Sequence, residues 1–432
     1  MPACPALLVA APASGQGKTT VVAALARLHS RQGRKVKVFK CGPDFLDPQI
    51  HRMASGQDCD NIDFRMAGED DARWRLAQAA TENDLILVEG VMGLHDGEPS
   101  AATLARQLGL PILLVQDASA MAGSFGAVAF GLKHYREDCG GGAPIAAVLA
   151  NRVGSDYHAR LCRNTLDEAD MAWFGHLPRD LEAALPERHL GLLPAAEIEG
   201  LRERLDRMAD LLAATPAAAL PPAVEFPPAA APQLPPLLAG KTIAVASDAA
   251  FCFAYPANRQ CLEAMGATLV DFSPLADKAL PACDGVWLPG GYPELHTAAI
   301  AANRSMAEAL KRHGAAGKPL LAECGGMMAL FQTLAGVDGE ISPAFGLLPG
   351  QTRMQKKLAA LGMMAADLPE GRLQGHSFHY STCHTPLTPL ARATKLSGGS
   401  PGEAIYRQDR ITASYVHFYF AASPEAAARL FL

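Results

Sequence analysis

The sequence lacks the features that mark several broad classes of protein. It has no block of basic residues and a formal net charge of −6, which argues against nucleic acid or an anionic membrane surface as a partner. Its ten cysteines form no C-x-x-C pair, which is typical of a reducing compartment rather than of disulfides or structural zinc. It has no charged signal-peptide segment and no apolar stretch long enough to span a bilayer. We therefore expect a cytoplasmic protein without a membrane or nucleic-acid partner.

The length of the chain predicts more than one domain. At 432 residues it is too long for a single hydrophobic core, and 49% hydrophobic with 19% charged residues is typical of a globular protein. Residues 215–236 are rich in alanine and proline, which indicates an extended spacer outside the cores. We assign 1–214 to an N-terminal domain, 215–238 to the linker and 239–432 to a C-terminal domain.

Residues 7–20 read as a strand followed by a phosphate-binding loop. An apolar run leads into two glycines, a lysine and two threonines, and a helix-compatible stretch follows at 21–28. Backbone N–H groups at a helix N-terminus bind polyphosphate, the lysine supplies a charge, and the first threonine can ligate Mg²⁺. The usual first glycine is replaced by Pro12. The predicted nucleotide-binding residues are Gly15, Gln16, Gly17, Lys18, Thr19 and Thr20.

Two carboxylates follow the second predicted strand, at residues 35–40. Asp44 and Asp47 lie in the segment G-P-D-F-L-D-P, directly after Lys40-Cys41. Loops at the carboxyl ends of parallel strands bind ligands in open α/β sheets. Local turn hydrogen bonds are an equally good explanation of these two residues.

A third predicted strand, at residues 84–89, ends in an acid. In a chain with a phosphate loop, this is where a Mg²⁺-organising carboxylate is expected, so Glu89 is a candidate. A strand-end acid that faces solvent is the alternative. Asp96, in the glycine-rich loop that follows, is a candidate for contact with substrate or phosphate.

Further buried strands are predicted at 111–116 and 145–149, with helices near 101–108, 123–135 and 198–213. Strands that alternate with helices predict a doubly wound, mostly parallel sheet, and right-handed crossovers place the strand-end loops on one edge. Asn151 lies in one of these loops. Its amide can read an adenine edge or form a turn.

The second half of the chain carries a candidate nucleophile. After a strand at 241–246, a helix from about 257 and a strand at 285–288, the segment K-P-L-L-A-E-C-G-G-M places Cys324 between a short strand and a helix. A sharp strand-to-helix turn exposes a nucleophile and directs N–H groups at an oxyanion, and a helix N-terminus lowers a thiol pKa. A free cysteine is more often a small core residue. The packing interpretation is the one we adopt for Cys252, Cys261 and Cys283.

A cysteine nucleophile needs a base, and the sequence offers several histidines. His417 lies in an aromatic strand-like run near the end of the chain, and His376, His379 and His384 compete with it. Spacing alone does not choose between His417 and His379. The pair His376-x-x-His379 has no third ligand with a spacing typical of a metal site.

Several motifs together carry a resemblance to a known family. Cys324, G-G-Y-P-E at 290–294 and the late His417 resemble a class I glutamine amidotransferase domain. The phosphate loop, K-C-G-P-D-F-L-D-P at 40–48 and E-G-V-M-G-L-H-D-G at 89–97 resemble the dethiobiotin-synthetase-like half of the cobyrinic acid a,c-diamide synthase family. The resemblance covers nearly the whole chain in the family's domain order. Other specific motifs are P-G-G-Y-P-E-L at 289–295, A-E-C-G-G-M-M at 322–328 and G-H-S-F-H-Y-S at 375–381.

The chain departs from the family pattern at two places. Ser377 stands where the family more often has Glu, and A-Y-P-A-N at 254–258 replaces Tyr-x-Glu-Asn. Tyr419 stands where triad-type glutaminases have Glu, which matches this family's Cys–His dyad.

The resemblance implies an α/β protein of two domains: an N-terminal P-loop domain with a doubly wound, mostly parallel sheet, and a C-terminal class I glutaminase-type domain. L-Glutamine would be hydrolysed at Cys324, with His417 as the base and the Gly291 region as the oxyanion hole. MgATP would phosphorylate the a- and c-acetate carboxylates of a corrin-type tetrapyrrole, and ammonia would displace the phosphate.

The resemblance also implies roles for matching residues of the first domain. Lys18, Thr19 and Lys40 would hold the phosphates, and Thr19, Glu89 and Asp44 would organise Mg²⁺. The residues implied around the substrate or acyl phosphate are Asp44, Asp47 and Asp96. A homodimer is expected by analogy with phosphate-loop relatives.

Four alternatives remain open. Cobyric acid synthase amidates other side chains of the same ring, but usually has a Pro-Gln-Asn-Met type segment where this chain has G-P-D-F-L-D at 42–47. A synthase that amidates nickel sirohydrochlorin is a second. A partition-type switch ATPase is a third, although it has no use for Cys324 and His417. The last is a degenerate glutaminase that takes only free ammonia, which the intact Cys-Gly-Gly disfavours.

Overall fold

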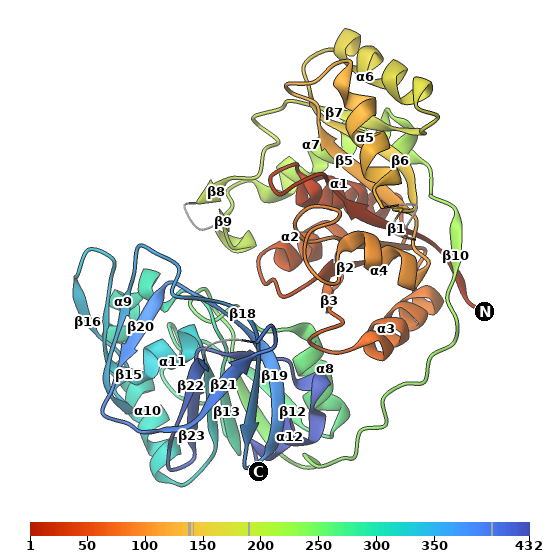
Figure 1. The fold of residues 1–432 in the computed structure, drawn as a ribbon. Coiled ribbons are helices and arrows are strands. Elements are labelled where there is room, and N and C mark those ends of the chain that lie inside the picture. The colour runs from red at the N-terminus through yellow and green to blue at the C-terminus, as the bar shows by residue number, and fades with distance from the viewer. Residues whose placement is uncertain (137–139, 141, 189–190, 399–400) are drawn as a thin grey trace. The chain divides into compact units, whose positions relative to one another are not determined.

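The computed structural model describes residues 1–136, 140, 142–188, 191–398 and 401–432. The chain divides into two compact units, and Figure 1 labels most of their helices and strands. Unit 1 comprises Met1–Phe64 and Glu69–Ala231, and unit 2 comprises Arg65–Gly68 and Pro232–Leu432. The predicted α/β class is confirmed for both.

Unit 1 is built on a sheet with the strand order β3-β2-β4-β1-β5-β6-β7, in which all these neighbours are parallel. The strands of this sheet are β1 (Ala3–Ala10), β2 (Val36–Cys41), β3 (Asp60–Ile62), β4 (Leu85–Glu89), β5 (Ile112–Asp117), β6 (Ile145–Val153) and β7 (Trp173–Pro178). The short strands β8 (Glu187–Arg188) and β9 (Gly191–Leu192) pair separately.

Helices cover both faces of this sheet. Their bounds are α1 (Lys18–Arg31), α2 (Asp47–Ser55), α3 (Glu69–Glu82), α4 (Ala101–Leu108), α5 (Ser124–His134), α6 (Asp156–Glu168) and α7 (Leu201–Ala213), with 3₁₀ turns at Ala195–Glu197 and Pro216–Ala218. Side chains of α1, α2 and α7 share one buried cluster, and those of α3, α4, α5 and α6 share the other. The predicted doubly wound arrangement is therefore confirmed.

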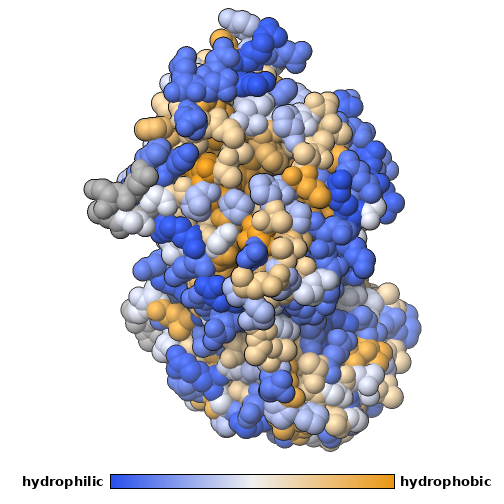
Figure 2. Space-filling model, turned by 90° about the vertical axis from the view of Figure 1, so that its right-hand side faces the viewer, coloured by the Kyte–Doolittle hydropathy of each residue, from blue (hydrophilic) through white to orange (hydrophobic). Residues whose placement is uncertain are grey.

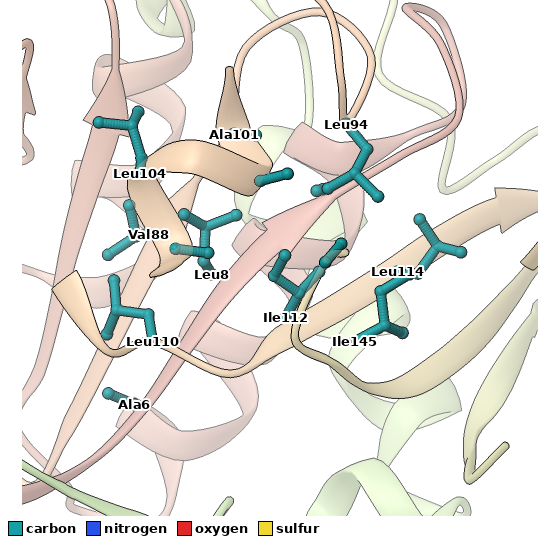
Figure 3. Close-up of a cluster of buried hydrophobic side chains, with 14 of the residues drawn as sticks. Ala6, Leu8, Val88, Leu94, Ala101, Leu104, Leu110, Ile112, Leu114 and Ile145 are labelled. Atoms are coloured by element: carbon teal, nitrogen blue, oxygen red, sulfur yellow. The ribbon is translucent and has the colours of Figure 1, made fainter. Parts of the chain in front are cut away.

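The central strands are apolar on both sides because both of their faces are covered. Along β1, Leu7 and Val9 belong to the cluster on one face, while Leu8 belongs to the cluster on the other. Figure 3 shows Leu8 beside Val88 of β4 and Ile112 of β5 in that second cluster. This explains the near-continuous apolar runs in the sequence.

The predicted linker differs from an extended spacer. Residues Ala223–Glu225 form strand β10, which pairs antiparallel with the start of β1, so unit 1 continues to Ala231. Ala217 is fully buried and Phe226 is 3% exposed against the core of unit 1. Apolar side chains between the prolines therefore find core contacts. β10 also tolerates flanking prolines because only three residues pair.

Unit 2 contains a mixed sheet with the order β12-β11-β13-β14-β23-β22-β21-β18-β19-β24 and a smaller sheet with the order β16-β15-β17-β20. In the first sheet, the neighbouring strands β12, β11, β13, β14 and β23 are parallel to one another. The remaining neighbours in that sheet pair antiparallel. The strands are β11 (Thr242–Ala246), β12 (Thr268–Phe272), β13 (Gly285–Leu288), β14 (Leu320–Glu323), β15 (Phe331–Ala335), β16 (Ile341–Pro343), β17 (Leu348–Met354), β18 (Ala360–Leu368), β19 (Gly371–His379), β20 (Ser381–His384), β21 (Pro389–Lys395), β22 (Pro401–Gln408), β23 (Ile411–Ser414) and β24 (His417–Phe418).

The helices of unit 2 are short. They are α8 (Pro256–Ala264), α9 (Thr297–Ala302), α10 (Arg304–Ala315), α11 (Gly325–Leu330) and α12 (Pro424–Arg429), with 3₁₀ turns at Pro293–Leu295 and Phe420–Ala422. Among the residues that the structure describes, no helix is both long and apolar enough to cross a membrane. In the view of Figure 2, hydrophilic residues cover most of the surface, with hydrophobic residues between them.

Candidate active sites

The phosphate loop of unit 1 joins β1 to α1. Gly15 and Gly17 have φ values of +77° and +94°, which side chains rarely adopt, and a Cβ on Gly17 would lie 2.2 Å from Nδ2 of Asn151. The loop therefore requires glycine at these positions. It lines a cavity of about 750 Å³, together with Lys18, Thr19, Thr20 and residues from other strand ends.

Lys18 and Thr19 connect this loop to the end of β4 and to the loop that follows β4. Nζ of Lys18 donates to the main-chain oxygen of Met92 at 2.6 Å, and Oγ1 of Thr19 donates to Oε1 of Glu89 at 2.8 Å. Burial lowers the pKa of Lys18, although the Glu89 carboxylate opposes that change. Thr19 thus contacts the predicted Mg²⁺-organising acid and Lys18 interacts with it electrostatically; Glu89 is 1% exposed rather than facing solvent.

Lys40 joins the carboxylates of the predicted site into one cluster. Its Nζ lies 2.5 Å from Oδ2 of Asp47, 2.9 Å from Oε1 of Glu89 and 3.9 Å from Oδ2 of Asp44. Burial opposes the charge on Lys40, but the three carboxylates outweigh it and raise its pKa well above the usual value. Burial likewise acts against the charge on Glu89, and Lys40 and His51 outweigh it, so the pKa of Glu89 falls.

Asp44 makes turn hydrogen bonds and also belongs to this cluster. Its Oδ1 accepts from the main-chain nitrogens of Leu46 and Asp47, at 2.8 and 3.1 Å. Burial and the nearby Asp47 carboxylate raise the pKa of Asp44 to about 7. The turn hydrogen bonds that the sequence offered as one explanation are therefore present, and ligand binding by Asp44 stays a prediction.

His51 is a residue of this site that the sequence reasoning missed. It is fully buried in α2, its Nε2 contacts Oε2 of Glu89, and its Nδ1 has no hydrogen-bond partner. Asp47 precedes it by four residues, so both side chains lie on the same face of α2. That spacing was the available signal, and reading it required α2 to be recognised as a helix.

Gln16 and Asn151 hold the phosphate loop in place. Oε1 of Gln16 accepts from the main-chain nitrogen of Asp117 at 2.8 Å, and Nδ2 of Asn151 donates to the main-chain oxygen of Gln16 at 2.9 Å. The predicted contact of Asn151 with adenine stays a prediction. The strand-end loops after β1, β5 and β6 meet here, as the parallel sheet requires.

Asp96 lies in the loop after β4. It is exposed, and its Oδ2 accepts from the main-chain nitrogen of Gly93 at 2.9 Å. A Cβ on Gly93 would lie 2.7 Å from the main-chain oxygen of Pro12, the position where the usual phosphate-loop pattern has glycine. Close packing at this point thus relies on the glycine at 93.

The sequence reasoning also missed the far wall of the cavity. This wall comes from the end of β7, the loop after it and α7, and it is largely apolar apart from Arg179 and Asp180. Its apolar members are Leu177, Pro178, Leu181, Ala183, Ala184, Leu185, Met208 and Leu211.

In unit 2, Cys324 lies at a sharp turn between β14 and α11. It has φ 45° and ψ −108°, a conformation that is rare for a residue with a side chain. Its main-chain nitrogen donates to the main-chain oxygen of Ser414 at 2.7 Å. The structure thus confirms the predicted strand-to-helix turn, and backbone strain at this residue is typical of functional sites.

The glycine pair at 290–291 lies against both other predicted members of this site. A Cβ on Gly290 would lie 2.2 Å from Cε1 of His417, and a Cβ on Gly325 would lie 2.9 Å from the main-chain nitrogen of Gly291. The elbow that carries Cys324, the predicted oxyanion region and the predicted base therefore meet in one place.

The pKa shifts of Cys324 and His417 favour a neutral thiol and a neutral imidazole in the resting site. The pKa of the Cys324 thiol is raised, not lowered as the helix N-terminus led us to expect, because burial acts against the thiolate and the nearby Glu294 adds to the effect. Burial lowers the pKa of His417 well below its usual value, with contributions from His376 and His379. A neutral imidazole is able to accept the proton of a thiol.

The competing histidines have other contacts. His376 stacks on His417 with ring centroids 4.9 Å apart, and its Nδ1 lies 2.8 Å from the Tyr255 hydroxyl. His379 stacks on Tyr415, and its Nε2 lies 3.2 Å from Oε1 of Glu403. His384 is exposed at the end of β20. This geometry favours His417 as the base, which stays a prediction. In the described part of the chain, no three His, Cys, Asp or Glu side chains are grouped to hold a metal ion.

Gly326 offers a test of the elbow geometry. A Cβ on this residue would lie 2.2 Å from the main-chain oxygen of Leu288, which cannot move without shifting the end of β13. We expect Gly326→Ala to lower glutaminase turnover about 10²-fold, as displacements near 1 Å do. Gly336→Ala is the matched control, because its nearest atom is 3.9 Å away. Steady-state glutamate release would measure both, and equal turnover in the two variants would contradict the elbow interpretation.

Both units match models of known protein families. The family model described as the CobQ/CobB/MinD/ParA nucleotide binding domain matches residues 7–193, and the one described as the CobB/CobQ-like glutamine amidotransferase domain matches residues 242–425. Hydrogenobyrinate a,c-diamide synthase of Stutzerimonas stutzeri is 55% identical over 427 residues, which cover 99% of this chain and 98% of that protein.

Two further relatives span nearly the full length. Hydrogenobyrinate a,c-diamide synthase of Pseudomonas aeruginosa is 55% identical over 427 residues, covering 99% of this chain and 97% of that protein. Cobyrinate a,c-diamide synthase of Herminiimonas arsenicoxydans is 47% identical over 428 residues, covering 98% and 96%. This chain belongs to the family of cobyrinate and hydrogenobyrinate a,c-diamide synthases.

Proposed function

We propose that this protein amidates the a- and c-acetate carboxylates of cobyrinic or hydrogenobyrinic acid, using ATP and glutamine, in cobalamin biosynthesis. One observation carries the proposal. A single chain, similar over its full length to synthases of this name, combines a phosphate loop beside a carboxylate cluster with a cysteine elbow beside a histidine.

Unit 2 supplies ammonia in this proposal. The Cys324 sulfur attacks the carboxamide carbon of glutamine while His417 accepts the thiol proton and passes it to the leaving ammonia. Main-chain N–H groups at the Gly291 region stabilise the oxyanion. Water then attacks the thioester, which releases glutamate and restores the thiol. The neutral resting pair of Cys324 and His417 supports this proton path.

Unit 1 activates the acceptor. A carboxylate is a poor acyl donor, so an oxygen of the acetate side chain attacks the γ-phosphorus of ATP and ADP leaves. Ammonia then attacks the acyl carbon, the phosphate leaves, and the nitrogen loses a proton. The phosphate-loop N–H groups together with Lys18 and Lys40 would hold the phosphates.

The residues at the phosphate loop fit Mg²⁺. Oγ1 of Thr19 and Oε1 of Glu89 lie 2.8 Å apart, and Asp44 is near the same cluster. Magnesium in nucleotide sites takes one or two protein oxygens and completes its shell with phosphate oxygens and water. When bound, the ion neutralises negative charge on the phosphates. Asp47 and Asp96 are proposed around the substrate.

The apolar far wall of the cavity fits a nucleobase. Leu177, Met208 and Leu211 offer apolar surface, and Asn151 lines the same cavity. Nucleotide pockets combine such walls with a few placed polar groups. We therefore propose that the adenine of ATP lies between this wall and the strand-end loops.

The rival readings are separated by their acceptors. We would measure ATP hydrolysis with glutamine present, adding hydrogenobyrinic acid, cobyrinic acid, cobyrinic acid a,c-diamide or nickel sirohydrochlorin in separate reactions. Stimulation by either of the first two, with a product mass that corresponds to two amidations, is expected. Stimulation only by the diamide would identify a cobyric acid synthase. Stimulation only by the nickel compound would identify the sirohydrochlorin enzyme, and no stimulation would favour a switch ATPase.

We also propose a cytoplasmic homodimer. The described cysteines are all free, which supports a reducing compartment. The dimer rests on the analogy with phosphate-loop relatives. Sedimentation equilibrium at micromolar concentration would give about twice the chain mass of 45.5 kDa, and the monomer mass would contradict the dimer.

A further inference from the structure

The strand that carries the proposed base is too short to fix it through strand pairing alone. β24 consists of His417 and Phe418, and it pairs with only Gly375 and His376 of β19. In Ser-His-Asp triads, a carboxylate bonded to the imidazole holds the ring in place. Tyr419, rather than a carboxylate, occupies the position two residues after the histidine.

Glu323 connects the elbow to this strand. It directly precedes Cys324 and is 2% exposed. Its Oε1 accepts from the main-chain nitrogen of Phe418 at 2.8 Å, and its Oε2 accepts from Nε1 of Trp287 at 2.8 Å. Each carboxylate oxygen is therefore committed to one N–H donor, and one of those donors belongs to the residue after His417.

Asn258 holds the same segment from the other side. It is 1% exposed, its Nδ2 donates to the main-chain oxygen of Phe418 at 2.8 Å, and its Oδ1 accepts from the main-chain nitrogen of Phe420 at 2.7 Å. Glu323 and Asn258 thus bind both main-chain polar groups of Phe418. Buried polar side chains cost free energy unless they are satisfied, and these two satisfy one short segment.

We propose that Glu323 and Asn258 are positioning residues for the glutaminase reaction, which fix His417 by holding the main chain of Phe418. Neither acts on glutamine itself. The side-chain clamp replaces the orienting acid of a triad, and it couples the base to the nucleophile because Glu323 and Cys324 are consecutive. The proposal rests on the proposed glutaminase role of Cys324 and His417.

The central test replaces Glu323 with glutamine. The variant keeps the size of the side chain, but its amide offers one oxygen and one NH₂, so an N–H of Phe418 or Trp287 then faces another donor. We expect Glu323→Gln to lower kcat for glutamine hydrolysis at least tenfold with KM changed less than twofold. Ammonia-dependent synthesis, which uses only unit 1 residues, is expected to stay within twofold of the unmodified protein.

A second substitution separates positioning from a general packing defect. Trp287→Phe removes the competing indole donor, so in the double variant the amide oxygen of the introduced glutamine can again accept from Phe418. We expect kcat for glutamine hydrolysis to be at least threefold higher in the double variant than in Glu323→Gln. Asn258→Asp keeps the acceptor for Phe420 but loses the donor to Phe418, and it is expected to lower the same kcat.

The outcomes divide cleanly. A kcat loss confined to glutamine hydrolysis, with recovery in the double variant, supports the clamp. Unchanged glutamine hydrolysis in Glu323→Gln overturns it. An equal loss of ammonia-dependent synthesis, or no recovery in the double variant, also overturns it, because the effect would then be one of folding. Failure of the proposed glutaminase role itself would appear separately, as an unmodified protein that releases no glutamate.

Discussion

Replacing Lys18 with alanine is expected to abolish amide synthesis with glutamine and with ammonia alike. The Lys18 ammonium lies in the loop that lines the large cavity of unit 1, where it donates to the main-chain oxygen of Met92. Alanine carries no charge that could replace the ammonium. Removal of one group that stabilises transition-state charge lowers kcat about 10²–10³-fold. Formation of ADP with each nitrogen source measures the effect, and we expect at least a 10²-fold loss with both.

Glutamine hydrolysis without acceptor is expected to survive in Lys18→Ala, since the proposed glutaminase residues all belong to unit 2. Lys35→Ala is the matched control, because that lysine is exposed just before β2. Synthesis by Lys18→Ala with ammonia at the level of the control would remove Lys18 from the mechanism. A loss of basal glutaminase as well would show that the variant is misfolded.

The sequence predicted the central strands of unit 1 because their signal is local and periodic, whereas it missed β3, β7, α2, α3 and α6. Fully buried parallel strands leave continuous apolar runs, so β4 and β5 were located to within a residue at each end, and α4 was predicted with its observed bounds. Ser100 caps that helix by accepting from the main-chain nitrogen of Thr103. Parallel strands then place their terminal loops on one edge, which is why Lys18, Thr19 and Glu89 could be grouped before their contacts were known.

The missed features depend on long-range contacts. The role of His51 depends on its contact with Glu89, 38 residues away in the sequence. The role of Glu323 depends on its hydrogen bond with Phe418, 95 residues away. The choice between His417 and His379 was open because it depends on which ring packs against Gly290, and spacing along the chain does not encode that contact. The linker prediction missed β10 for a similar reason. Proline content signals stiffness, but pairing of β10 with β1 depends on a distant partner.

Replacing Cys324 with alanine is expected to separate the two half-reactions. The thiol is the only proposed group that bonds to glutamine carbon, so its loss should remove glutamine hydrolysis by at least about 10⁴-fold, in line with the loss of a covalent nucleophile. Ammonia supplied from solution bypasses this step. We therefore expect ammonia-dependent synthesis within twofold of the unmodified protein, measured as amide product by mass spectrometry.

The choice of control matters because most of the cysteines that the structure describes are buried. Cys283 is also buried in unit 2, its thiol pKa is also raised by burial, and it lies just before β13 without an elbow. Cys283→Ala should therefore keep glutamine-dependent synthesis. If both variants lose glutamine-dependent and ammonia-dependent synthesis equally, Cys324 is structural. The strained backbone at Cys324 would then need another explanation, because a merely structural cysteine gains nothing from φ 45°.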